Sequence, residues 1–107
     1  MKIEELKDLG FEMVSDGDGE IDHGYACDLL SEVMGKAKPD TVWLTVQSHI
    51  NIIAVAAITG IRAIILCNDH KFDEETIQRA KKEKIALFKT ALNTFEACGK
   101  IYQKGIR

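Results

Sequence analysis

The chain has 107 residues, with 14 Lys and Arg side chains against 17 Asp and Glu and a formal net charge of −3. This acidic balance argues against general nucleic-acid binding, which needs a basic surface. The hydrophobic content of 46% is that of a globular protein, and the length suits one domain, so we expect residues 1–107 to fold as a single domain.

The location predicted from the sequence is the cytoplasm. The first ten residues mix charges and do not resemble a signal peptide, and no apolar run approaches the ~20 residues that span a bilayer. The three cysteines, Cys27, Cys67 and Cys98, include no C-x-x-C pair. An odd number without that spacing favours reduced thiols over a disulfide framework or a zinc site.

A short strand is predicted first, at Phe11–Val14, and the polar turn SDGDGEIDHG follows it. A helix is predicted next, from Tyr25 to Ala37, and Pro39 marks its end. Its inward stripe is expected to contain Leu29, Leu30, Val33 and Met34.

Two continuous apolar strands are predicted in the middle of the chain, at Thr41–Val46 and Ile61–Cys67. The helix between them, His49–Thr59, is apolar nearly all round, and Gly60 stands where a glycine would close it. Such a helix must be buried on several sides. We therefore expect a homodimer, with this helix at or beside the interface.

The last part of the chain predicts an exposed helix, a strand and a final helix. The exposed helix, Asp73–Lys84, has acidic residues at its start and lysines at its end, which suits the helix dipole. The strand is Ile85–Lys89. Asn93 and Glu96 have the spacing of a capping box, and the helix they open is expected to turn Phe95, Cys98 and Ile101 inward.

The order βαβαβαβα predicts an α/β fold, a three-layer sandwich around a small, mostly parallel sheet of four to five strands. Polar residues follow each strand, beginning with Ser15 and Asp16 after the first. Ligands of parallel α/β sheets bind in the crevice at the carboxyl ends of the strands. The ligand-binding residues that we predict there are Gln47, Ser48, His49, Asn51, Asn68, Asp69 and Thr90.

Two further patterns in the sequence have simpler interpretations than the chemistry they suggest. Cys67 and His49 could face each other as a nucleophile and its base, but no third group orients them, and a packed strand-end cysteine is the simpler interpretation. Asp16, Asp18 and their acidic neighbours alternate as in a calcium loop, yet the Gly and Glu that an EF-hand requires are absent. We therefore expect no catalytic residue, no metal site and no cofactor.

Two stretches of the sequence resemble the DRTGG-domain family. They are GYACDLLSEVMGKAKPDTVWLTVQSHINIIAVAAITGIRAIILCND and ALFKTALNTFEACGKIY. The resemblance extends over nearly the whole chain after Gly10. At the positions that give the family its name, this chain differs: Ser48-His49 stands in place of Asp-Arg, and Cys67-Asn68-Asp69 in place of Thr-Gly-Gly. The chain thus resembles a divergent, stand-alone member.

The resemblance implies a regulatory or oligomerising α/β domain, often dimeric, without chemistry of its own. Such domains are related to the N-terminal domain of HPr kinase/phosphorylase, whose kinase activity lies in a separate domain with a phosphate-binding loop. The motif G-x-x-x-x-G-K-[ST] does not occur in this chain. We therefore expect a protein that is not an enzyme.

Two functions remain open from the sequence. The first is a regulatory domain that senses a small anionic or nucleotide-like ligand at the strand ends and acts through a homodimer. The second is a protein-interaction or oligomerisation module with no small ligand, whose functional surface is the apolar helix and whose protein partner is unknown. Neither function involves nucleic acid or a membrane.

Overall fold

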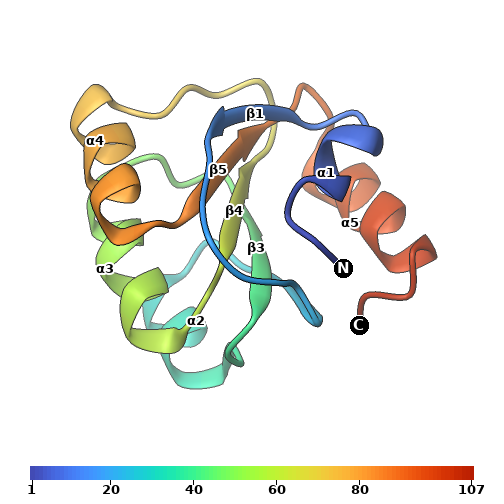
Figure 1. The fold of residues 1–107 in the computed structure, drawn as a ribbon, viewed down its shortest axis with the longest axis horizontal. Helices are drawn as coiled ribbons and strands as arrows, with labels where there is room; N and C mark the ends of the chain where they lie inside the picture. The colour runs from blue at the N-terminus through green and yellow to red at the C-terminus, as the bar shows by residue number, and fades with distance from the viewer.

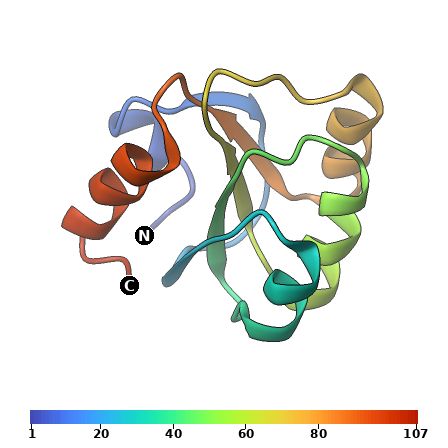
Figure 2. The same ribbon diagram turned by 180° about the vertical axis from the view of Figure 1, so that it is seen from behind.

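The computed structural model describes all 107 residues and has a central sheet between two layers of helices (Figures 1 and 2). None of the helices has the length and apolar composition to cross a membrane. In chain order the elements are α1 Glu5–Asp8, β1 Glu12–Ser15, β2 His23–Ala26, α2 Leu30–Lys36, β3 Thr41–Thr45, α3 Asn51–Thr59, β4 Ala63–Leu66, α4 Glu74–Glu83, β5 Ala86–Lys89 and α5 Thr94–Gln103.

The sheet has five strands in the order β1-β5-β4-β3-β2. Strands β2 to β5 pair in parallel, and β1 pairs antiparallel with β5 at one edge. This confirms the predicted α/β sandwich with a mostly parallel sheet. The first predicted strand is the antiparallel member, a direction that its own sequence does not encode.

Helices cover both faces of the sheet, which explains the continuous apolar strands. On one face, Leu44, Ile65 and Phe88 belong to the core that α1 and α5 close. On the other face, Trp43 and Ile64 pack under α2, α3 and α4. Because successive side chains of a strand point to opposite faces, β3 and β4 need apolar residues at every position.

Strand β2 corrects the predicted helix Tyr25–Ala37. Tyr25 and Ala26 are the end of a strand that pairs with β3, and α2 begins only at Leu30. The expected inward stripe is also partly wrong, because Leu29 is 59% exposed and Met34 is 47% exposed. The four residues of β2 are held by hydrogen bonds to β3. Their own sequence therefore gives little indication that they form a strand.

Helix α3 obtains most of its cover within the chain. It lies on the sheet between α2 and α4, and its buried residues include Ile52, Ile53 and Val55. Gly60 closes it in the left-handed conformation, with φ 80°. Ile58 remains 72% exposed, so it is the side chain that a dimer interface at this helix would cover.

The last helix begins as the sequence predicts. The Asn93 side chain accepts a hydrogen bond from Glu96 N, and the Glu96 carboxylate accepts one from Asn93 N. Ile101 is buried and Cys98 half-buried, as expected. The expectation for Phe95 is wrong: this side chain is 86% exposed. Phe95 is the second residue of α5, and it lies outside the stripe of the helix that faces the sheet.

Candidate functional site

The carboxyl ends of β3, β4 and β5 form one edge of the sheet, and three loops extend from it. The β3–α3 loop carries Gln47, Ser48 and His49 and leads to Asn51, the first residue of α3. The loop after β4 begins with Asn68 and Asp69, and the loop after β5 begins with Thr90. Because the three strands are neighbours and parallel, the topology brings all seven predicted residues to this edge.

Ser15 and Asp16 do not belong to this edge. Strand β1 runs against β5, with Glu12 beside Lys89 and Ser15 beside Leu87. The end of β1 therefore lies at the amino edge, away from the other three polar clusters. At the carboxyl edge its place is taken by the segment that follows β2, which contains Asp28.

The start of α3 offers unpaired backbone donors. Its first residues, from Ser48 to Asn51, have no intramolecular acceptor for their N–H groups, and no side chain caps the helix. Free N–H groups and the positive end of the helix dipole favour an anion at this position. Asn51 is exposed there, with both a donor and an acceptor on its side chain.

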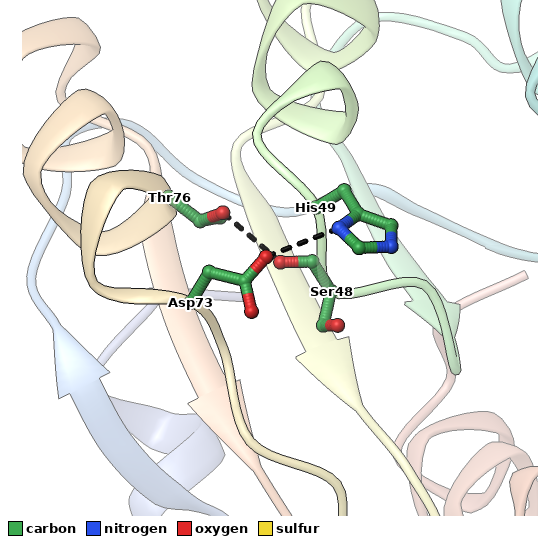
Figure 3. A network of polar contacts seen from close by, with 4 residues as sticks. All are labelled: Ser48, His49, Asp73 and Thr76. Carbon is green, nitrogen blue, oxygen red and sulfur yellow. Dashed lines mark hydrogen bonds and ion pairs between the residues drawn. The ribbon is translucent and has the colours of Figure 1, made fainter.

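Two contacts fix the β3–α3 loop against α4 (Figure 3). His49 Nδ1 lies 3.1 Å from an Asp73 carboxylate oxygen, and the Thr76 hydroxyl donates to Ser48 O at 3.0 Å. Thr76 is fully buried, whereas the His49 side chain is 71% exposed. The histidine is therefore held in place at one nitrogen while its ring stays accessible to a ligand.

The loops after β4 and β5 are joined by backbone hydrogen bonds. Asn68 N donates to Leu92 O at 2.9 Å, and Asp69 N donates to Thr90 O at 3.0 Å. Asn68 and Asp69 both have positive φ angles, 64° and 59°. Such a conformation is uncommon outside glycine and best tolerated by Asn and Asp. Both side chains are exposed, and neither has a hydrogen-bond partner within the chain.

Asp28 is a residue of this edge that the sequence did not single out as part of a site. Its carboxylate oxygen Oδ1 accepts hydrogen bonds from the Thr45 hydroxyl at 2.8 Å and from Val46 N at 2.9 Å. Its carbonyl accepts one from Gln47 Nε2 at 3.0 Å. Asp28 thus ties the segment after β2 to the start of the β3–α3 loop. Asp28 falls inside the helix predicted at Tyr25–Ala37, and 17 positions separate it from Thr45, so no local pattern indicated the contact.

Cys67 and His49 do not form a nucleophile and base. Cys67 Sγ is buried and lies 3.8 Å from Ile65 O in its own segment, whereas His49 contacts Asp73. Burial raises the pKa of the Cys67 thiol above its ordinary value of 9.0. An activated cysteine has a lowered pKa. No group of three or more His, Cys, Asp or Glu side chains is arranged to hold a metal ion.

Alkaline pH is expected to destabilise the fold through this buried thiol. Since the folded-state pKa of Cys67 is raised, the unfolded chain loses the proton first, near pH 9.0. The free energy of unfolding should therefore fall as pH rises from 9.0 towards the folded-state pKa, by up to ~1.4 kcal/mol per pH unit for each such group. Urea titrations of the wild type and Cys67→Ala between pH 7.5 and 10 measure this slope.

The Cys67→Ala variant should show a shallower slope, because only Cys98, whose pKa burial also raises, remains. Equal slopes in the two proteins would contradict the assignment to Cys67.

Comparison with known proteins identifies relatives of the fold. The family model of the DRTGG domain matches residues 26–104. No curated protein sequence matches the chain.

Among solved structures, the chain is similar to the CBS and DRTGG domains of the regulatory region of Clostridium perfringens pyrophosphatase, solved in complex with its activator, diadenosine tetraphosphate. The TM-score is 0.73 at 17% sequence identity, and the match covers 95% of this chain. The chain spans about half the length of that structure, since 46% of it is covered. At this identity the likeness establishes the common fold.

Proposed function

Because the chain belongs to the DRTGG-domain family, we propose that it is a non-catalytic regulatory domain that binds a small anionic or nucleotide-like ligand at the carboxyl edge and acts as a homodimer. The observation that carries this proposal is the uncapped start of α3, whose free N–H groups lie at the same edge as Asn68 and Asp69. The structural neighbour supports the ligand class, since its activator is a dinucleotide tetraphosphate.

Six of the seven predicted residues have a direct role in this proposal; the exception is Asp69, whose carboxylate would repel an anion. A phosphate or carboxylate binds the free N–H groups at the start of α3. A hollow beside Asn51 is lined also by Ile50, Ala54 and Arg79, and the Arg79 guanidinium, which lies 3.6 Å from the Glu83 carboxylate, can contact the same negative charge. His49 contacts the ligand through its free ring nitrogen, and Asn68 offers its amide to a base or another polar group. Thr90, Gln47 and Ser48 complete the edge.

A thermal-shift panel tests the ligand class. The panel contains adenine and guanine nucleotides, dinucleotides including diadenosine tetraphosphate, acetyl phosphate and sugar phosphates. A specific ligand at a hundred times its dissociation constant should add roughly 2.7 kcal/mol to the free energy of unfolding, which raises the melting temperature of a chain of this size by several degrees.

A double variant, His49→Ala with Asn68→Gly, should abolish that shift and still fold. Glycine is chosen at position 68 because the backbone there has φ 64°. The control is Lys38→Ala, an exposed residue at the amino edge, which should keep the full shift. A double variant that binds as tightly as the wild type would show that the ligand uses another surface.

The second candidate is an interaction module without a small ligand. It is favoured by six large hydrophobic side chains that remain exposed, including Ile58 on α3 and Phe95 on α5. A panel without any shift, together with stable binding of a protein partner, would support this function instead. Under either proposal the three free cysteines suit a reducing compartment, and we place the protein in the cytoplasm.

A further inference from the structure

The two edges of the sheet are built differently. At β1, the register shifts between Met13 and Ser15, and Glu12 places a carboxylate on the edge. Bulges and charges of this kind discourage pairing with another chain. Strand β2 is the opposite edge, and it pairs with β3 in a regular register. Its sequence, HGYA, contains no proline, lysine or acidic residue.

Half of the backbone groups of β2 point away from the molecule. His23 N and Cys27 N donate to carbonyl oxygens at or beside β3. Since alternate residues of a strand bond to one neighbour, the N–H and C=O groups of Gly24 and Ala26 face outward. Figure 2 shows β2 on the near side of the sheet, between α5 and α2, and no strand pairs with its outer side.

An apolar hollow of about 140 Å³ lies next to this edge, between β2 and α5. Gly24 has no side chain to fill this hollow. A methyl group at that position would fit, in ordinary van der Waals contact with Ile106 at 3.6 Å. Cys98 and Tyr102 of α5 line its other side, and Arg107 lines it too, with its guanidinium 3.6 Å from the centroid of the Tyr102 ring. Phe95 lies two turns before Tyr102 on the same flank of the helix, while Lys100, on the opposite flank, bonds Leu9 O beside α1.

The two helices beside the β2 edge carry most of the exposed apolar surface. Leu29 and Met34 at α2, and Phe95 and Tyr102 on α5, are four of the six large hydrophobic residues that remain exposed. With 86% of Phe95 and 58% of Tyr102 exposed, the two rings offer roughly 300 Å² per copy, against ~800 Å² per partner in a standard interface. The strand, the hollow and α2 supply the rest.

We propose that a second copy of this chain pairs with the β2 edge, strand against antiparallel strand, so that the two sheets join into one. A twofold axis perpendicular to the sheet puts both α5 helices on the same face, with their aromatic flanks opposed across the seam. Each copy then contributes the same strand, without lysine or acidic residues, and the same α5 flank, whose exposed rings are apolar except where the Arg107 guanidinium covers Tyr102. This largely apolar, self-complementary surface favours a second copy over a strongly charged peptide.

This inference goes beyond the proposed function, because it assigns a dimer surface without reference to a ligand. It also differs from an interface at α3, where Ile58 is the large side chain left most exposed. The two locations give opposite results for the same pair of substitutions. The ligand panel measures binding and light scattering measures mass. A negative result in one experiment therefore does not decide the other proposal.

Light scattering after gel filtration, from 5 to 200 µM, tests the proposal. The wild type should have twice the 11.9 kDa mass of the chain. Ala26→Pro removes an outward N–H donor without breaking a bond to β3, and Phe95→Lys with Tyr102→Lys charges the α5 flank; both variants should be monomeric. The matched control, Ile58→Lys, should remain a dimer.

Amide hydrogen exchange gives a second measurement that needs no variant. The outward amides of Gly24 and Ala26 should exchange slowly in concentrated wild-type protein and at least tenfold faster on dilution to the monomer. A monomeric wild type at 200 µM, β2 and α5 variants that stay dimeric, or a dimer lost in Ile58→Lys would each overturn the proposal. Rapid exchange of both amides in the dimer would do the same.

Discussion

The Trp43→Ala substitution is expected to lower the free energy of unfolding by about 4 kcal/mol. Trp43 is fully buried in the middle of β3, between the sheet and the layer of α2, α3 and α4. Its Nε1–H donates to Cys27 O at 2.8 Å, so the substitution removes a large apolar contact and leaves a carbonyl without its donor. Since domains of this size are stable by only ~5–15 kcal/mol, the melting temperature should fall by well over 10 °C.

Urea unfolding followed by circular dichroism measures this loss, because the variant lacks the chain's one tryptophan and its fluorescence. The control is Trp43→Phe, which keeps most of the buried ring but not the indole donor. It should lose about half as much stability. A Trp43→Ala variant within 1.5 kcal/mol of the wild type would mean that the site relaxes around the missing ring.

The middle of the fold was predictable from the sequence because its signals are local. β3 and β4 are continuous apolar runs, and Gly60 ends α3 where a positive φ is needed. The capping box of Asn93 and Glu96 forms as its spacing predicts. In each case the residues that decide the structure lie within a few positions of one another, so tertiary context had little to change.

The edges of the fold were not predictable in the same way. β2 gains its structure from β3, and its four residues include a glycine and an alanine, which are both poor strand formers. The direction of β1 depends on its partner β5. Phe95 and Leu29 have helical spacing from buried residues, yet whether they lie under the sheet or beyond it depends on where each helix sits.

The candidate site was predictable as a set of loops and not as a set of contacts. Parallel strands end at one edge, so polar residues after β3, β4 and β5 had to meet there. The partners of those residues come from elsewhere: His49 contacts Asp73, and the Ser48 carbonyl accepts from Thr76. Sequence separations of 24 and 28 residues carry no periodic signal that would reveal such pairs.

Asp28 is the contact through which the fold supports the candidate site, and Asp28→Ala is expected to cost about 3 kcal/mol of the free energy of unfolding. Hydrogen bonds to a charged group contribute roughly 1.5–3 kcal/mol each, and the variant loses two, one of them from the fully buried Thr45. Asp28 is an exposed residue, and solvent screening keeps each of the two contributions at the lower end of that range. Urea unfolding at pH 7 measures the loss.

The same substitution should weaken any ligand that binds at the start of α3. The Asp28 carboxylate holds Val46 N and the Thr45 hydroxyl, so its removal frees the start of the loop that positions the unpaired N–H groups, while the backbone carbonyl of residue 28 still accepts from the Gln47 side chain. Asp28→Asn keeps an acceptor at Oδ1 and should lose less than half as much stability, with ligand affinity nearly intact. If the alanine and asparagine variants were equally stable, the carboxylate contacts would not be what holds the loop.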